Sequence, residues 1–514
     1  MKETADPPVV STRAKPRRRF RILYLAPVFA LIALVTWALA SPMGSSPDDD
    51  FHLASIWCAN SANTAACTPG PEAGDNYVPQ AVNLAAHCYN FKADVSAACQ
   101  AQGFSLDPAK KVLTGRGSFS GSYPPVYYAA MSVFVTPNIL LSVVLMRIVN
   151  GILLIGITTA LFLLLPRFRR PTLIWGWLVT CLPLGIFLIA SNNPSSWAII
   201  GIGSLWLALL GYFETAGKRR VGLGLVTVVA AIMAAGARAD SAIYALISIA
   251  VVIVLTFRRE KSYFVAATLP LALVIVSGMF YLSSGQASVA STGLTAGIRT
   301  PPGFMTLLLF NIEHIQSLWV GSFGIWNLGW LDTPMPPIVI FGALGAAFAV
   351  LFAGLARVSK RKLLSLGIVA LVLWLLPMYV LQQGRSFVGE AVQPRYILPL
   401  IILLVGIAVL PVGQWVIRFS RLQLVIIVVA LVVSQAFALH ENMRRYITGI
   451  DVSGLNLDRS IEWWWPISIS PMAVWISGSF AFAAVVVILV REITRPGLPA
   501  APLELPLTTI ALTD

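Results

Sequence analysis

Three consecutive aspartates, Asp48, Asp49 and Asp50, stand near the start of the chain and are followed by His52. A positioned carboxylate can take a proton from a hydroxyl group, which accelerates a reaction by about 10²–10⁴-fold. The same acids are a second-choice site for a divalent metal, although no fixed metal-ligand spacing accompanies them. They could also cap a helix that begins near Phe51, because acidic residues favour helix N-termini. The sequence thus predicts Asp48 or Asp49 as a general base, and one aspartate can cap the helix while its neighbour has this role.

Other polar side chains recur at the ends of long apolar runs. Arginine suits a phosphate there, because its guanidinium group is planar, permanently charged and able to donate two parallel hydrogen bonds. We expect lipid-phosphate and substrate contacts from Arg395, Arg238, His52, His314, Arg147, Asp240, Tyr123, Trp330, Asp332, Gln393 and Tyr396. Each has a structural alternative: Arg238 and Asp240 can form a local ion pair, Arg147 can reach the membrane interface, and tryptophans can anchor there.

The composition places these residues in a membrane protein. The chain has 514 residues, of which 57% are hydrophobic and only 11% charged; its mean hydropathy is +0.79. Soluble domains carry about 25% charged residues. We therefore expect an all-α integral membrane fold, a bundle of about 12 transmembrane helices whose first outer loop is large and carries short interfacial helices. The loops on the basic side are too short for a nucleotide-binding domain, which argues against an ATP-driven pump.

The predicted spans follow from apolar runs of about 20 residues, the length that crosses a bilayer. They are 22–41, 139–165, 172–190, 195–213, 221–237, 240–257, 263–282, 337–356, 363–381, 396–417, 422–440 and 472–491. The first run has a rival interpretation as a cleavable signal peptide, but it is long for one. Residues 123–136 could form a short additional insertion, which we interpret as a helix lying on or dipping into the outer leaflet.

The net charge of +14 is a topology signal. With twelve spans, 24 of the 36 Lys and Arg residues fall on one side of the membrane, the side that the positive-inside rule makes cytoplasmic. We expect a multi-pass protein of a bacterial plasma membrane with both termini cytoplasmic and the active site extracytoplasmic. Residues 1–21 form a basic cytoplasmic arm, 22–495 the transmembrane domain, and 496–514 a cytoplasmic tail. Contact with membrane lipids is expected, and nucleic acid is not.

Three outer loops are long: 42–138, 283–336 and 441–471. The first contains Cys58, Cys67, Cys88 and Cys99. Four cysteines in one non-cytoplasmic loop indicate two disulfides. Three pairings are open, of which Cys58–Cys67 with Cys88–Cys99 is the simplest, and four free thiols are the alternative.

Several motifs together resemble a known family. They are Pro47-Asp48-Asp49 with His52, Tyr123-Pro124-Pro125 with Tyr127-Tyr128, Arg147, Asn193-Pro194, Arg238-Ala239-Asp240, Gly329-Trp330-Leu331-Asp332, and Gln393-Pro394-Arg395-Tyr396 with Pro399. The chain resembles bacterial polytopic membrane proteins of a domain-of-unknown-function family grouped with the GT-C glycosyltransferases. It departs from the family pattern at Asp49, where the family usually has Glu, at Pro394, where it usually has Gly, and at Ser195, where it often has an acid.

The resemblance implies a GT-C-like fold and a polyprenyl-phosphate-linked sugar as donor, with the catalytic acid in the first outer loop. The expected activity is a glycosyltransferase of cell wall biogenesis that moves a sugar to a cell-envelope glycan or glycolipid acceptor, with an aspartate base. The resemblance indicates no definite cofactor, and a divalent metal at Asp48–Asp50 stays open. A flippase or transporter of the lipid-linked sugar, or a non-catalytic envelope-assembly protein, is the alternative. The absence of an internal sequence repeat favours the enzyme over a transporter.

Overall fold

The computed structural model of the chain describes residues 20–294, 303–413 and 416–495. The predicted tail 496–514 and most of the predicted arm 1–21 lie outside the described residues. Within the described ranges, eight helices are long and apolar enough to cross a membrane. They are α7 (Ile139–Leu164), α10 (Ser195–Glu214), α12 (Ala239–Thr256), α13 with α14 (Lys261–Ala266, Thr268–Leu282), α18 (Pro337–Leu355), α19 (Lys360–Gln383), α21 (Arg421–Ile447) and α22 (Pro471–Ile493). A multi-pass membrane protein is therefore confirmed.

The four other predicted runs are also helical, but each departs from a regular long apolar helix. Two are short: α2 (Ala26–Leu39) and α20 (Pro394–Ala408). The helix α11 (Gly217–Ala235) is not apolar throughout, because its first turn contains the basic residues Lys218, Arg219 and Arg220. The run 172–190 is divided into α8 (Arg170–Leu178) and α9 (Leu184–Ile189), because Pro183 lacks the N–H that a continuous helix needs.

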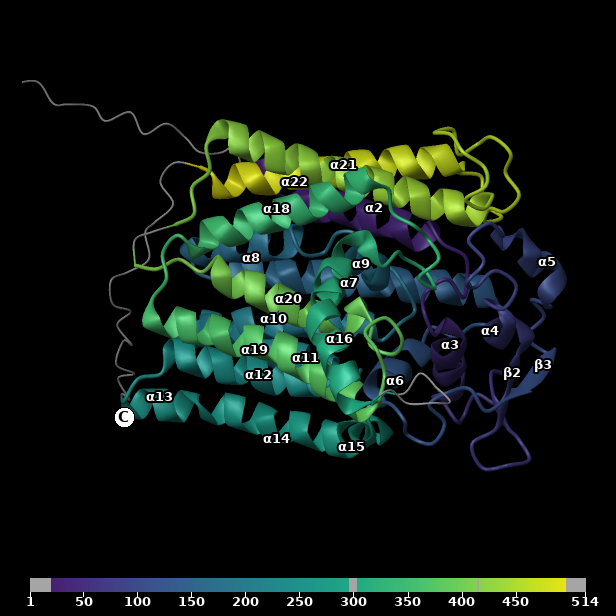
Figure 1. Cartoon of the computed structure of the whole chain (residues 1–514), viewed down its shortest axis with the longest axis horizontal. Coiled ribbons are helices and arrows are strands. Elements are labelled where there is room, and N and C mark those ends of the chain that lie inside the picture. The colour runs from purple at the N-terminus through teal and green to yellow at the C-terminus, as the bar shows by residue number, and fades with distance from the viewer. Residues whose placement is uncertain (1–19, 295–302, 414–415, 496–514) are drawn as a thin grey trace, which may run out of the picture.

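The central helix of the bundle is α10, which is buried along almost all its length. It packs against α11, α12, α20, α9 and α7. Close packing without a hydrophobic drive from water depends on small residues at helix contacts. Gly201 is such a contact, since a Cβ atom there would lie 2.7 Å from the carbonyl oxygen of Ala230 on α11. Figure 1 shows the long helices running side by side, with α2, α18, α21 and α22 along one edge.

One end of the bundle carries a mixed lobe, residues 49–136, drawn at the right of Figure 1. Its helices are α3 (Asp49–Cys58), α4 (Gln80–Leu84), α5 (Gln100–Gly103) and α6 (Val126–Ser132), with a 3₁₀ turn at Ala97–Cys99. Short helices were expected, but a sheet was not. Strands β1 (Thr68–Pro69), β2 (Asn76–Pro79) and β3 (Lys111–Thr114) form an antiparallel sheet in that order, with Tyr77 opposite Leu113.

Disulfides Cys58–Cys67 and Cys88–Cys99 close two short loops of the lobe. The simplest of the three pairings is thus the one that the structure has. The first bridge joins the end of α3 to the sheet, and the second joins the segment after α4 to the start of α5. The lobe is therefore held together by covalent bonds as well as by its small core.

Shorter elements connect the later spans. They are a 3₁₀ turn at Gly285–Ser288, α15 (Val289–Thr292), α16 (Phe304–His314), α17 (Gln316–Val320) and a π-helical turn at Gly321–Ile325. The tryptophans of the predicted second and third outer loops are partly used as internal hydrogen-bond donors. Trp330 donates to the carbonyl of Gly44, and Trp465 donates to the carbonyl of Leu39. Both therefore fix the chain after α2, which leads to the candidate site.

Candidate functional site

Asp48 occupies the N-cap position of α3 but does not cap it. Its φ of 61° is in the left-handed region, which few residues other than glycine adopt. The carboxylate turns instead toward two arginines: Oδ2 lies 2.5 Å from Arg395 and Oδ1 lies 3.1 Å from Arg116. The side chain remains 36% exposed. This backbone conformation therefore directs Asp48 away from its own helix and toward a charged cluster.

Arg395 holds both the side chain and the backbone of this turn. It lies at the start of α20, is 4% exposed, and donates to the carbonyl of Pro47 at 3.0 Å as well as to Asp48. Asn193 donates to the same carbonyl at 2.7 Å. The Arg395 Nε atom is buried and has no hydrogen-bond partner among the described residues. One donor of this buried guanidinium group is consequently unused within the described part of the chain.

Arg238 and Asp240 form a second ion pair beside the first. The guanidinium group meets Asp240 at 2.8 and 2.9 Å, and its Nη1 atom lies 3.4 Å from the Ser195 hydroxyl. The ring of Tyr396 stands between the two arginines, 4.8 Å from Arg238 and 5.1 Å from Arg395. We call Asp48, Asp50, Arg116, Arg238, Asp240, Arg395 and Tyr396 the Asp48 cluster. Its members Asp48 and Arg395 are 347 positions apart in the sequence.

The charges of the Asp48 cluster balance, with three arginines facing three aspartates. Arg116 completes this balance by pairing with Asp50 as well as with Asp48. Burial by itself raises the pKa of Asp48, but the charges of Arg395 and Arg116 outweigh it and hold the pKa well below its usual range. Asp48 is consequently ionised at neutral pH.

His52 lies next to Asp48 within a group of aromatic side chains. Its Nδ1 atom lies 2.9 Å from the Tyr128 hydroxyl, and its ring packs against Phe51, Tyr123 and Tyr128. Burial and the neighbouring arginines lower the pKa of His52 well below its usual value, although Asp48 opposes them, so the ring is neutral at pH 7. The Nε2 atom is buried and finds no partner in the described part of the chain.

A cavity of about 490 Å³ lies next to these aromatic side chains, since Tyr123 and Tyr128 both line it. Hydroxyl, amide and aromatic groups dominate its lining, which consists of Ser55, Cys58, Ala59, Asn76, Ser118, Phe119, Gly121, Tyr123, Pro125, Tyr128, Ala129 and Ser283. None of these lining residues carries a charge. Burial raises the pKa of Tyr123 to about 12, so its hydroxyl stays protonated and can donate a hydrogen bond. The cavity is therefore suited to a neutral, hydroxyl-rich molecule.

Asp49 has a different place from Asp48. Its side chain is fully buried in the first turn of α3 and accepts hydrogen bonds from the Ser46 backbone and hydroxyl. Burial raises the pKa of Asp49 to about 6, against the opposing effects of Arg147 and Ser46. Of the two predicted bases, only Asp48 is placed to meet a ligand, and Asp49 holds the turn.

The segment from Ala38 to Pro47 is buried, and all ten of its carbonyl groups accept a hydrogen bond. Arg147 alone serves three of them, those of Ala38, Ser41 and Pro42. The remaining seven carbonyls are served by Trp465, Asn442, Tyr89 with Gln100, Trp330, Tyr446, the Asp49 backbone, and Asn193 with Arg395. We call this segment the carbonyl loop; it fixes the position of Asp48.

Arg147 is therefore a positioning residue rather than a phosphate contact. Its other two bonds go to Asn192 and Ser45, so the guanidinium group is fully engaged within the protein. Asp332, another predicted contact, pairs with Arg445 at 2.9 Å and accepts from the Phe91 backbone. Together with Trp330, it belongs to the contacts that hold the carbonyl loop in place, and it does not line the cavity.

Two further predicted residues lie outside the Asp48 cluster. His314 stacks on Phe310 at 4.0 Å, and its Nδ1 atom contacts the carbonyl of that residue, so its contacts are with its own helix. Gln393 is the N-cap residue of α20, next to Arg395, and its Oε1 atom is buried without a partner in the described ranges. No group of three or more His, Cys, Asp or Glu residues that could hold a metal occurs in the described part of the chain.

Sequence reasoning missed Arg116 and Arg445. Arg116 follows strand β3 in a loop with no recognisable pattern, so only the fold brings it to Asp48 and Asp50. Arg445 was assigned to an outer loop, but α21 continues to Ile447. The helical spacing of Leu439, Asn442 and Tyr446, all buried, was a signal for that extension.

Residues 31–405 match the model of a family described as a predicted membrane protein, DUF2142. The chain belongs to this family. The matched range contains the carbonyl loop and every member of the Asp48 cluster, whereas Arg445 and Trp465 lie beyond it. Comparison with curated proteins finds no match. The family description assigns no reaction, and the site is therefore interpreted from its geometry.

Replacing Arg147 with Met should lower the stability of the protein severely, since three buried carbonyls lose their donor. An unsatisfied buried polar group costs about 1–3 kcal/mol. We expect a drop of several degrees in melting temperature for purified Arg147→Met in detergent. Exposed Arg418→Met serves as the matched control and should melt like the parent protein. Equal melting of Arg147→Met and Arg418→Met would contradict the positioning role.

The raised pKa of Asp49 predicts a pH effect on stability. An unfolded aspartate has a pKa near 3.8, so between about pH 4 and pH 6 the folded protein binds the extra proton and loses stability as the pH rises. Asp49→Asn removes this effect. The melting temperature of Asp49→Asn relative to the parent should thus increase from pH 4 to pH 6.5 and then level off. A difference that is constant over this range would refute the assignment.

Proposed function

We propose that this protein is a membrane glycosyltransferase of the GT-C type. It transfers a sugar from a polyprenyl-phosphate donor to a glycan or glycolipid of the cell envelope. The observation that carries the proposal is the partly exposed Asp48 between Arg395 and Arg116, beside the uncharged 490 Å³ cavity. Two buried nitrogens next to this carboxylate, Arg395 Nε and His52 Nε2, have no partner among the described residues.

The donor phosphate is assigned to the arginines. A sugar linked to a lipid phosphate is a phosphodiester with one negative charge, and the Asp48 cluster is neutral without it. The phosphate therefore competes with Asp48 for Arg395 and Arg116, using the free Nε atom of Arg395. As Asp48 loses these partners, its pKa rises and it becomes a stronger base. Donor binding thus activates the carboxylate.

The acceptor is assigned to the cavity. Its aromatic rings and hydroxyl groups suit a neutral sugar, and two of its lining residues, Tyr123 and Tyr128, also contact His52, the neighbour of Asp48. The acceptor hydroxyl oxygen attacks the anomeric carbon, and the bond from that carbon to the phosphate oxygen breaks. The hydroxyl proton passes to Asp48, and the phosphate leaves with the bonding electrons, its new charge stabilised by Arg395 and Arg238.

The placement in the membrane follows from charge. The basic segments Arg167–Arg170, Lys218–Arg220 and Arg258–Lys261 lie at the end of the bundle opposite the lobe. The positive-inside rule makes that end cytoplasmic. We assign the protein to a bacterial plasma membrane with twelve spans, cytoplasmic termini and an extracytoplasmic site, where polyprenyl-linked sugars meet envelope acceptors.

Asp48→Asn should abolish sugar transfer, with a loss of about 100-fold or more, because an amide cannot take the proton. Asp48→Glu should retain part of the activity, and Arg395→Lys should lose most of it, since lysine lacks the planar fork. The measurement is transfer of radiolabel from a panel of short-chain polyprenyl-phosphate pentoses and hexoses to an envelope glycolipid extract, in membranes that contain each variant.

Asp107→Asn, an exposed acid of the lobe, is the matched control and should be fully active. Melting temperatures establish that each variant is folded. A folded Asp48→Asn protein with normal transfer would remove Asp48 as the base. If the parent protein moves labelled lipid across vesicle bilayers but transfers nothing to any acceptor, the transporter alternative holds instead.

Cysteine labelling tests the orientation. In a Cys181→Ser background, the four lobe cysteines are bonded in disulfides, so a single new thiol can be followed. Gln102→Cys on α5 should react with a membrane-impermeant maleimide on intact cells. Lys261→Cys at the opposite end should react only after the membrane is opened. The reverse pattern would place the Asp48 cluster in the cytoplasm and exclude the proposed donor orientation.

A further inference from the structure

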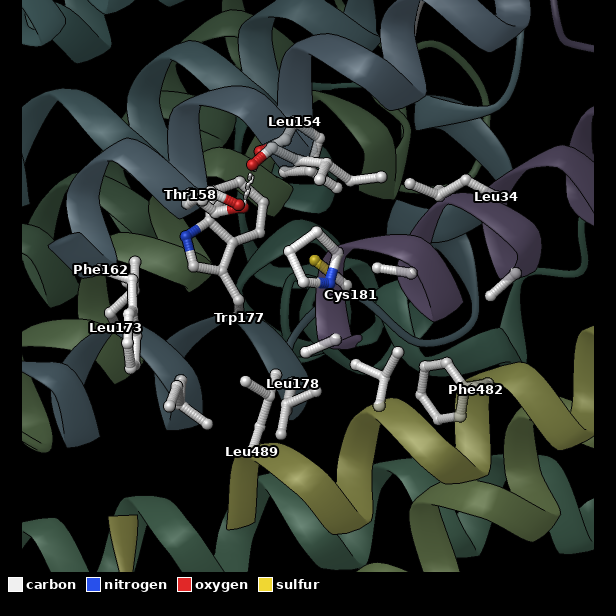
Figure 2. Close-up of a pocket in the computed structure, with 18 of the residues that line it drawn as sticks. Leu34, Leu154, Thr158, Phe162, Leu173, Trp177, Leu178, Cys181, Phe482 and Leu489 are labelled. Carbon is white, nitrogen blue, oxygen red and sulfur yellow. Dashed lines mark hydrogen bonds between the residues drawn. The ribbon is translucent and has the colours of Figure 1, made fainter. Parts of the chain in front are cut away.

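A second cavity lies at the end of the bundle remote from Asp48. It has a volume of about 300 Å³, and its walls come from α2, α7, α8, α9 and α22. Figure 2 shows Leu34, Phe162, Leu173, Leu178, Phe482 and Leu489 around it. The lining is almost wholly apolar and comes mainly from membrane-spanning elements. We call this cavity the apolar cleft.

The break between α8 and α9 helps to form the apolar cleft. Where α8 ends at Leu178, the chain turns through Cys181 and Leu182 before α9 begins, and both residues line the space. A continuous helix along this path would carry its side chains past α2 at regular intervals. The interruption instead leaves a recess that is bounded by α2 on one side and α22 on the other.

Two nitrogen donors line this apolar space without a partner. Arg170 Nε and Trp177 Nε1 are both buried and make no hydrogen bond within the described ranges. The Arg170 guanidinium group lies over the Phe162 ring at 4.2 Å. Arg167 and Arg219 are the neighbouring positive charges, and Glu492, which pairs with Arg495, is the neighbouring acid. The end of the apolar cleft at Arg170 therefore offers a donor and excess positive charge to an anion, and Trp177 offers a second donor further along α8.

We propose that the apolar cleft binds one acyl chain of an anionic phospholipid, with its phosphate at Arg170. Trp177 Nε1 donates to an oxygen of the same lipid, such as an ester carbonyl. The occupant is a lipid because the apolar walls lie at membrane depth, and it is anionic because the Arg170 donor and the surplus charge lie at the end of the cleft. This site is separate from the donor and acceptor sites proposed at the lobe.

The headgroup, and not the acyl chain, determines which lipid binds most tightly. An acyl chain gains little by leaving bulk lipid for an apolar cleft, because both surroundings are equally apolar. Selectivity therefore comes from Arg170, since anionic headgroups are attracted to basic residues near the membrane surface. An anionic lipid should consequently bind more tightly than a zwitterionic lipid with the same chains. This difference separates a specific site from ordinary solvation by lipid.

Trp177 provides a readout within the apolar cleft. Phosphatidylglycerol or phosphatidylcholine with brominated chains is added to the purified full-length protein in detergent, and tryptophan quenching is recorded. The part of the quenching that disappears in Trp177→Phe reports this site. We expect this quenching to saturate at a lower concentration of brominated phosphatidylglycerol than of brominated phosphatidylcholine. Arg170→Gln should weaken the binding of phosphatidylglycerol by about fivefold and leave the binding of phosphatidylcholine unchanged.

Three variants complete the test. Ala30→Phe, on the α2 wall, fills the apolar cleft and should abolish the Trp177-dependent quenching by both lipids. Arg170→Lys keeps the charge and should preserve the preference for phosphatidylglycerol. Exposed Arg418→Gln is the matched control and should behave like the parent. Equal binding of the two lipids by the parent, or unchanged binding in Arg170→Gln or in Ala30→Phe, would overturn the proposal. Sugar transfer is not measured, so failure here leaves the proposed enzyme untouched.

Discussion

The candidate site depends on the satisfaction of ten buried carbonyl groups between Ala38 and Pro47. A segment that leaves the last turn of α2 and then has no regular structure carries polar backbone into the protein interior, where an unpaired group is costly. Here nearly every donor is a side chain of another element, and Arg147 alone supplies three bonds. With its backbone fixed from many directions, the carbonyl loop can hold Asp48 in a left-handed conformation and present its carboxylate to Arg395.

Charge balance is the second constraint on this site. Arg395 and Arg238 are buried, which is tolerable only because Asp48 and Asp240 pair with them. A neutral cluster has no surplus attraction for a distant anion, so a phosphate must displace a carboxylate in order to bind. In the proposed reaction, this exchange couples ligand binding to the basicity of Asp48. At the other end of the bundle, Arg170 has no such paired carboxylate among the described residues, and the proposed lipid site depends on this surplus charge.

Much of this arrangement could be predicted from the sequence. Apolar runs located the helices, four cysteines in one outer loop indicated two disulfides without fixing their pairing, and polar residues at run ends predicted a cluster that includes Asp48, Arg238 and Arg395. Their individual roles could not be predicted, because a motif does not show which way a side chain points. Asp48 and Asp49 are adjacent in sequence, yet one faces two arginines and the other is buried against Ser46. The sheet and Arg116 lacked a pattern, since short strands and loop residues are fixed by distant contacts.

The donors to the carbonyl loop also set an order of assembly. During synthesis the loop emerges early, whereas Arg395, Asn442 and Trp465 are made about 350 to 425 residues later. Until those segments are inserted, the loop lacks these hydrogen-bond donors. Nothing then stabilises Asp48 in the left-handed conformation over an ordinary helix-capping one. An incomplete chain thus contains the acid but not its geometry. The arrangement around Asp48 arises only when the later helices pack against the first, so their insertion is the step that creates the candidate site.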